Sequence, residues 1–286
     1  MLWLPLVLGS AASASVAALI SKCISDEVEP KVAMAIRGVV VLLMVGSAVL
    51  ISGKFQGIFE IPLYSLAFIL ISGAALAWAR IFYFEALARG DVGKVSAVNK
   101  TSASLAIFMS FVFLGVGLTY TTFLSAVLIL VGAAIMIEGN GPTKDKWLML
   151  AIASAICGAA YTVLGKPGSQ YVDPFLATGI RAIVFFIITW TAVYISGKKV
   201  DMKNIGDSDK GIIILSGVFF GLSWLLLYYA IQVGPVDTVS VLDRLSLPII
   251  VICSYFLLGE RMNKRSLFGI LIMTLGILTP LVELLM

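Results

Sequence analysis

The chain has 286 residues, of which 60% are hydrophobic and 13% are charged, and its net charge is +4. Soluble domains carry about 25% charged residues, so this composition excludes a soluble protein. The chain has no histidine, which excludes His-based metal sites, catalytic triads that contain His, and His proton relays. Its cysteines, Cys23, Cys157 and Cys253, are far apart in or beside apolar stretches, which predicts small core residues and no disulfide or metal cluster.

Ten apolar segments follow one another along the chain, each bounded by charged residues or by Gly and Pro. They lie at 2–21, 32–52, 62–84, 95–114, 120–138, 147–165, 175–195, 211–231, 238–258 and 267–285. Each is close to the roughly 20 residues that a helix needs to cross a bilayer core. The first lacks a basic start and a processing site, so we interpret it as a membrane helix and not as a cleaved signal peptide. The sequence predicts an all-α polytopic membrane protein with ten transmembrane helices.

Basic residues are distributed unevenly between the two sets of loops. The loops after the odd-numbered spans hold thirteen lysines and arginines, whereas the opposite side, with both termini, has only Lys54 and Lys166. Basic loops are retained in the cytoplasm. We therefore predict a multi-pass protein of the plasma membrane whose basic loops are cytoplasmic and whose termini are both external.

The sequence matches itself at an offset of 144 residues. The coincidences include Lys22 with Lys166, Pro30 with Pro174, Arg37 with Arg181, Gly90 with Gly234, Ser102 with Ser246, Gly115 with Gly259 and Gly132 with Gly276. Chance similarity among apolar helices explains paired leucines but not paired Lys, Arg, Pro and Ser. We predict a duplication with one five-helix repeat at 1–142 and a second at 143–286. Because five is odd, the second repeat enters the membrane upside down, which is the inverted-repeat plan of secondary transporters.

Several motifs resemble those of one transporter family. The stretch Gly-Leu-Ser-Trp-Leu-Leu-Leu-Tyr-Tyr-Ala at 221–230, Leu-Asp-Arg-Leu-Ser at 242–246 and Leu-Leu-Gly-Glu-Arg at 257–261 are similar to the EamA family of the drug/metabolite transporter superfamily. The first half echoes them with Tyr-Phe-Glu-Ala-Leu-Ala-Arg-Gly at 83–90 and Val-Asn-Lys-Thr-Ser at 98–102. The resemblance implies ten helices and export or exchange of small metabolites, without a substrate.

Three features depart from related proteins. The first repeat lacks the Glu-Arg that follows Leu-Gly in the second. Better-known ten-helix relatives have cytoplasmic termini, which is opposite to the charge distribution. The related small multidrug-resistance proteins have an essential glutamate in the first helix, where this chain has Ala14 and, in the second repeat, Gly158. Proton coupling by that glutamate is therefore excluded.

Charged residues within predicted spans are site candidates, because they are costly in a bilayer and usually face a cavity or a partner. They are Arg37, Arg80, Glu85, Lys100, Arg181, Asp243 and Arg244. We expect Arg37 and Arg181 to snorkel toward an interface, with a gate or packing role as the alternative. Glu85 and Lys100 lie at similar depth, which favours an ion pair between them.

The fourth and ninth spans carry the same polar stripe. Asn99, Ser102 and Ser110 share a helical face and recur as Asp243, Ser246 and Ser254. A water-filled cavity fits this stripe, and hydrogen bonding between helices is the alternative. Lys100 and Arg244 are at equivalent positions and could each bind an anionic group or brace a carboxylate. Pro248 should bend the ninth helix.

Aromatic stripes on the third and eighth spans are either helix packing or a cavity wall. These are Trp78 and Phe82 with Glu85 and Arg89, and Trp224 and Tyr228 with Gln232. The complete predicted substrate-binding set is Trp78, Glu85, Asn99, Lys100, Ser102, Trp224, Tyr228, Asp243, Arg244 and Ser246.

These patterns predict a secondary transporter of a small metabolite, with alternating access and with export or exchange as the direction. Interior cations outnumber interior anions, which favours an anionic or zwitterionic solute such as an amino acid or a carboxylate. Asp243 could be the ion-coupling group and Arg244 could hold a substrate oxyanion. The alternatives are a passive channel, a membrane sensor or an exporter of organic cations. We predict no enzyme activity, catalytic residue, cofactor, metal or nucleic-acid partner, a monomer or homodimer in the lipid bilayer, and leave a coupling proton or ion open.

Overall fold

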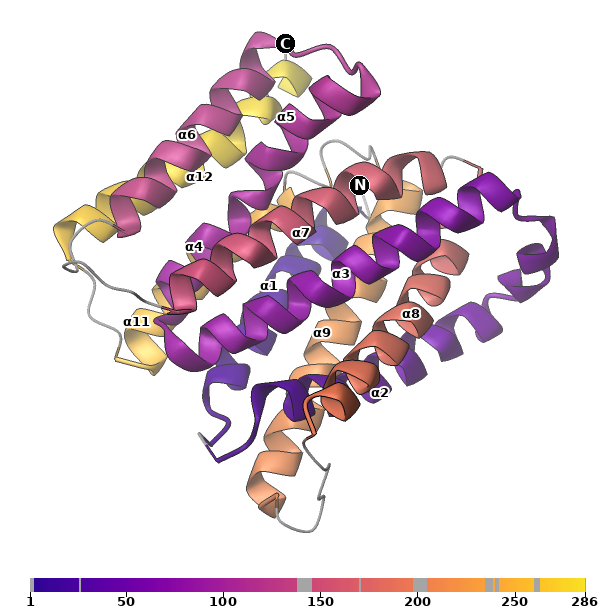
Figure 1. Ribbon diagram of the computed structural model, residues 1–286. Helices are drawn as coiled ribbons and strands as arrows, with labels where there is room; N and C mark the ends of the chain where they lie inside the picture. Colours follow the sequence, from indigo (N-terminus) through magenta and orange to yellow (C-terminus); the bar gives the residue numbers. More distant parts are fainter. Residues whose placement is uncertain are drawn as a thin grey trace.

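The computed structural model describes residues 3–25, 27–137, 146–169, 171–197, 205–234, 239, 242–259 and 263–285. Its α-helices are α1 (Trp3–Lys22), α2 (Pro30–Ile51), α3 (Leu63–Arg89), α4 (Val92–Lys100), α5 (Ser102–Leu114), α6 (Tyr120–Ile137), α7 (Lys146–Gly168), α8 (Pro174–Ile195), α9 (Asp207–Val233), α11 (Ser246–Leu257) and α12 (Lys264–Leu285). Two 3-10 helices, η1 (Lys54–Glu60) and η2 (Asp243–Leu245), complete the secondary structure. The described residues form no β-strand, so the predicted all-α class is confirmed (Figure 1).

Eight segments of the described chain are long and apolar enough to cross a membrane. They are α1, α2, α3, α4 together with α5, α6, α7, α8 and most of α9. The described residues contain eleven α-helices instead of the predicted ten. One reason is that the predicted fourth span divides at Thr101, where α4 ends and α5 begins.

The helix ends follow from a few residues that recur in both halves. Pro30 and Pro174 begin α2 and α8, where the missing N–H of proline costs nothing. Glycines with positive φ occupy matched turns, Gly53 and Gly197 at 68° and 67°, and Gly115 and Gly259 at 62° and 65°. Matched stop signals therefore end matched helices.

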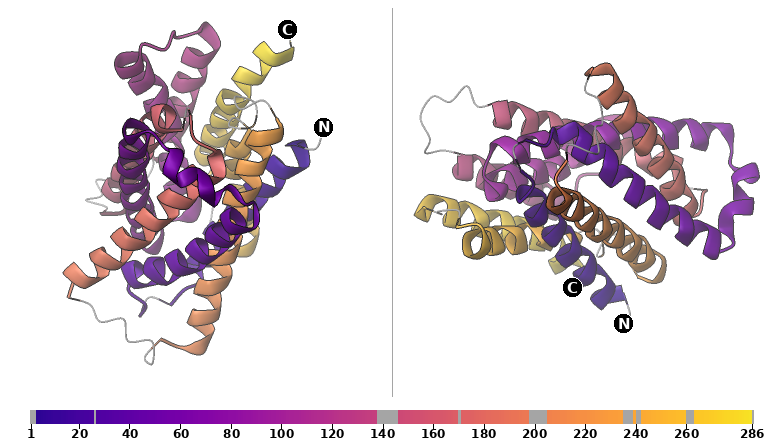
Figure 2. Two further views of the ribbon diagram at one scale, coloured as in Figure 1. Left: turned by 90° about the vertical axis from the view of Figure 1, so that its right-hand side faces the viewer. Right: turned by 90° about the horizontal axis from the view of Figure 1, so that it is seen from below.

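The two halves also contact each other in matched pairs. A Cβ atom at Gly73 of α3 would lie 3.1 Å from the Cβ of Val184 on α8, and one at Gly217 of α9 would lie 3.0 Å from the Cβ of Val40 on α2. Gly217 and Val184 stand 144 residues after Gly73 and Val40. Likewise α3 packs against α7, and α9 packs against α1 (Figures 1 and 2). Such exchanged contacts are those of two repeats related by a two-fold operation.

The helices α6 and α12 lie side by side at the edge of the molecule (Figure 1). Their backbones touch, since a Cβ at Gly132 would lie 2.5 Å from the carbonyl oxygen of Gly269. The matched position Gly276 is similarly close, at 2.8 Å from the Cβ of Leu128. Small residues thus let this pair of helices approach closely, as is common in membranes.

The expectation that Arg37 and Arg181 snorkel is wrong. They are only 5% and 4% exposed, and both guanidinium groups bind protein atoms. Arg181 donates hydrogen bonds to the hydroxyls of Ser72 (3.1 Å) and Ser169 (2.8 Å) and to a carbonyl of α7 (3.3 Å). Arg37 donates to the hydroxyl of Ser21 at 3.0 Å. The position of each arginine near a helix end suggested that its guanidinium group reaches the lipid headgroups. Both groups instead bind atoms inside the protein.

Candidate functional site: a cationic cavity between the repeats

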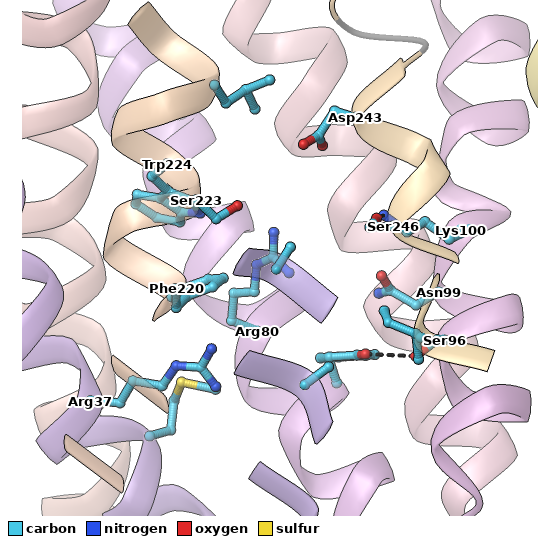
Figure 3. Close-up of a pocket in the computed structure, with 16 residues that line it drawn as sticks. Arg37, Arg80, Ser96, Asn99, Lys100, Phe220, Ser223, Trp224, Asp243 and Ser246 are labelled. Atoms are coloured by element: carbon cyan, nitrogen blue, oxygen red, sulfur yellow. Dashed lines mark hydrogen bonds between the residues drawn. The ribbon is translucent and has the colours of Figure 1, made fainter. Parts of the chain in front are cut away.

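Two adjoining cavities of about 100 Å³ and 210 Å³ lie between the repeats. Both are lined by Arg80, Asn99, Lys100, Trp224, Leu227 and Asp243. We call them together the central cavity, and Figure 3 shows its smaller part. Helices from both repeats contribute, since Arg80 belongs to α3 and Trp224 to the matching helix α9. The site is therefore assembled only when the two halves pack.

Both polar stripes lie where a helix changes its pitch. In the first half, the N–H of Thr101 bonds to the carbonyl of Val98, three residues back, at the junction of α4 and α5. In the second half, Asp243–Leu245 form the 3-10 helix η2 before α11 begins. Pro248 explains this break, because its ring excludes an α-helical carbonyl at Arg244. The predicted irregularity near Pro248 is present, and it lies on the N-terminal side of the proline.

Asn99 is held by a hydrogen-bond chain that crosses between the repeats. Its Nδ2 atom donates to Ser154 Oγ at 2.6 Å, and that hydroxyl donates to the Ala79 carbonyl at 2.8 Å. Ser154 is fully buried on α7. One donor thus meets one acceptor at each of these two links.

Asp243 is the matched residue of the second half and has the matched surroundings. Ser10 on α1 places its Oγ 2.8 Å from Asp243 Oδ1 and 3.0 Å from the Ser223 carbonyl. The Ser223 hydroxyl lies 3.2 Å from the same Ser10 oxygen. Ser10 and Ser223 stand 144 residues from Ser154 and Ala79 respectively. The duplication therefore places a carboxyl where the other half has an amide.

Cations dominate the lining of the central cavity. Arg37, Arg80, Lys100 and Arg244 line it, and Asp243 is the one carboxylate among the described lining residues. Lys100 donates to Ser246 Oγ at 2.8 Å.

Two of the arginines flank an aromatic ring. The guanidinium carbons of Arg37 and Arg80 lie 4.2 Å and 5.0 Å from the Phe220 ring centre, within the range of cation–π contacts. Figure 3 shows Arg80 reaching into the middle of the cavity, between Phe220 and Asn99. The two guanidinium groups are thus held near each other within the space open to a solute.

The structure brings together most of the predicted set. Asn99, Lys100, Ser102, Trp224, Asp243, Arg244 and Ser246 line the central cavity. Trp78 and Glu85 are not among its lining residues. Trp78 is 43% exposed and its ring lies beside Phe82, with 5.7 Å between centres. The prediction for Tyr228 falls on a side chain outside the described part of the structure.

The expected ion pair between Glu85 and Lys100 is not formed. Glu85 instead pairs with Lys31 at 3.6 Å and with Arg89 at 3.4 Å, while Lys100 turns to Ser246. Similar depth along neighbouring helices could not show that the two side chains point in different directions.

Sequence reasoning missed several lining residues. Ser96 and Phe220 line the cavity, as does Tyr83, whose hydroxyl bonds to Ser96 at 2.8 Å. Ser10 and Ser154 do not line the cavity but bond to Asp243 and Asn99. They had one usable signal, because they are serines at equal positions in the first helix of each repeat. The helix pairing that brings them there is tertiary.

A polar cavity between duplicated halves of a multi-helix membrane protein is typical of membrane transporters. The sequence profile of the EamA-like transporter family matches residues 1–138 and 145–281. The chain therefore belongs to the EamA family of the drug/metabolite transporter superfamily.

Relatives agree with this class. The uncharacterized transporter in the cobO 3' region of Sinorhizobium sp is 31% identical over 135 residues, which are 47% of this chain and 96% of that protein. The uncharacterized transporter YetK of Bacillus subtilis (strain 168) is 27% identical over 135 residues, 46% of this chain and 39% of that protein. A protein of known crystal structure superposes with a TM-score of 0.69 over 97% of this chain and 96% of its own, at 15% identity. That likeness shows the fold alone.

Proposed function

We propose that the protein is a secondary transporter of a small anionic or zwitterionic metabolite, such as an amino acid or a carboxylate, in the plasma membrane. This proposal rests on the net positive charge of the side chains that line the central cavity. Four cationic side chains and the single described carboxylate line a space between the helices. Uncompensated charge is costly there, and an anionic group on the solute would offset it. Arg80 and Lys100 are the side chains best placed to hold that group.

Alternating access would expose this cavity to each side of the membrane in turn. The exchanged contacts of the two repeats, such as those of Gly73 and Gly217, support a two-fold arrangement in which one half rocks against the other. Inversion of the repeats across the membrane plane is part of this proposal. Export or exchange is the direction we propose, in line with the family resemblance.

A thermal-shift screen of purified protein against amino acids, carboxylates, sugars and amines tests the solute class. We expect stabilisation by anionic or zwitterionic compounds, because they compensate the cavity cations. The variant Arg80→Gln should lose this shift, whereas Arg89→Gln should keep it, since Arg89 pairs with Glu85 outside the cavity. Stabilisation by permanent organic cations alone would contradict the proposal and favour the alternative of a cation exporter.

Counterflow in liposomes tests the mechanism. A solute from the screen should enter faster when the same solute is already inside, because a carrier returns loaded. A passive channel would give no such stimulation, and a membrane sensor would give no flux. The family match and the transporter relatives favour a transporter over an enzyme.

The orientation in the membrane is a separate proposal that rests on the loops. The side with both termini has two basic residues, Lys54 and Lys166, against thirteen on the other side. We expect a reporter fused after Met286 to be external. A cytoplasmic reporter would overturn this orientation and leave the fold unchanged.

A further inference from the structure

The two halves of the central cavity differ in the hydrogen-bond donors that are available at the matched residues Asn99 and Asp243. In the first half, the Asn99 amide donates to Ser154 Oγ, and Ser154 donates to the Ala79 carbonyl. In the second half, Ser10 Oγ lies within hydrogen-bond distance of Asp243 Oδ1 and of the Ser223 carbonyl. A hydroxyl has one proton to donate. An ionised Asp243 takes this proton, and the Ser223 carbonyl, which lies inside α9, keeps its helical hydrogen bond.

The same atoms allow two arrangements of protons. In the first, the Ser223 hydroxyl donates to Ser10 Oγ, 3.2 Å away, and Ser10 donates to an ionised Asp243. A proton on Asp243 allows the second arrangement. The carboxylic acid would donate to Ser10, and Ser10 would donate to the Ser223 carbonyl, which reproduces the pattern of Asn99, Ser154 and Ala79.

An ionised Asp243 also has cations beside it in the cavity. Lys100 lines both parts of the cavity together with Asp243, and Arg244 lines the larger part. The charged and titratable groups that line the cavity with it are Arg37 on α2, Arg80 and Tyr83 on α3, Lys100 on α4, Tyr161 on α7 and Arg244. The neighbouring helices α1, α9 and α11 contribute serines and apolar side chains to the lining. The carboxyl thus has one set of partners for each protonation state.

We propose that Asp243 is a reversible proton-binding site, which completes the hydrogen-bond chain of Ser10 when protonated and pairs with the cavity cations when ionised. Asn99 is the permanent counterpart of its protonated form. The link to the solute rests on the proposed function. An anion held by Arg80 and Lys100 would compete with the Asp243 carboxylate for the same cations, so a bound anion and a bound proton should accompany each other. A cationic solute would instead compete with the proton.

Infrared difference spectroscopy of the full chain in lipid nanodiscs tests the site without any solute. Titration from alkaline to acidic pH should produce the C=O stretching band of a buried carboxylic acid. Asp243→Asn should abolish that band. Glu85→Gln should keep it, because Glu85 is ion-paired with Lys31 and Arg89 outside the cavity. The Asn variant is expected to fold, since an amide already occupies the equivalent position in the first half.

A double variant that exchanges Asn99 and Asp243 tests whether the loss of the band in Asp243→Asn is an indirect effect of the substitution. Asn99→Asp combined with Asp243→Asn moves the carboxyl to the matched position, where Ser154 and the Ala79 carbonyl provide the same surroundings. The titrating band should return in this protein. A band that survives Asp243→Asn, or a wild-type spectrum in which no band titrates, would overturn the proposal. Because the experiment contains no solute, its failure is distinguishable from a failed solute screen, which would overturn only the proposed function.

Discussion

One half of the cavity is built on α4, and the other on η2 and α11. Their side chains are arranged alike but differ in chemical character. Asn99 and Asp243 face serines at matched positions, at 2.6 Å and 2.8 Å. The amide is neutral at every pH, whereas the carboxyl can bind and release a proton. Duplication has thus preserved the positions of the side chains, while substitution at single positions has made the two halves different. The following variants separate what the halves share from what distinguishes them.

The largest effect is expected for Asp243→Asn, which makes the two halves alike. We expect flux into liposomes to lose all dependence on a pH gradient, because the one described cavity carboxyl no longer titrates. The melting temperature should stay close to that of the parent protein. The measurement is counterflow and gradient-driven uptake of a solute from the thermal-shift screen, with Glu85→Gln as the control.

The opposite result would assign Asp243 a bracing role. In that case Asp243→Asn lowers the melting temperature, and the surviving protein transports with unchanged pH dependence. Stability and flux must therefore be measured on the same preparation.

Substitution of the matched arginines, Arg37 and Arg181, should affect different properties of the protein. Arg181→Met removes three hydrogen bonds to a charged group and should lower the free energy of unfolding by about 2–4 kcal/mol. Arg37→Met removes one such bond and should cost less stability, but it should weaken solute binding because Arg37 lines the cavity. Denaturation of purified protein and solute-induced thermal shifts measure the two effects. Equal losses of stability would refute the distinction.

The glycines of α6 and α12 should show what the halves share. Gly132→Ala and Gly276→Ala place a methyl group within 2.5 Å and 2.8 Å of atoms on the facing helix. Each should destabilise the protein by roughly 1–3 kcal/mol through overpacking. Gly46→Ala is the control, because beyond the backbone and chain neighbours of its own helix no atom lies within 4 Å of its added Cβ. If only one of the two substitutions destabilises the protein, the two matched positions do not contribute equally to its stability.

The smallest effect concerns Arg244, which follows Asp243 in the chain. Arg244→Ala should weaken solute binding about tenfold, or about 1.4 kcal/mol, because the other cations remain in the cavity. Arg89→Ala, outside the cavity, should leave binding unchanged. The comparison uses solute titrations by thermal shift. A change in melting temperature without a change in affinity would make Arg244 a structural residue.

Much of this arrangement could be predicted from the sequence. Apart from the fourth and ninth spans, which are divided, the apolar segments predicted the helices to within a few residues, because the length of a span is set by the bilayer. The offset of 144 residues related Asn99 to Asp243 and Ser102 to Ser246, since a gapless duplication keeps matched residues in register. All four line the cavity. The predictions failed where the direction of a side chain decides the outcome, as for Glu85.

What the sequence by itself determined is the class of protein, the helices and the pairs of equivalent residues, because these depend on composition and on local spacing along one chain. Only the tertiary structure decided which equivalent residues face the cavity and which face a protein interior. Arg37 lines the cavity, while its counterpart Arg181 donates hydrogen bonds to Ser72 and Ser169. Depth along a helix is fixed by residue number, but the side of the helix that meets a partner is fixed by how the two repeats pack against each other.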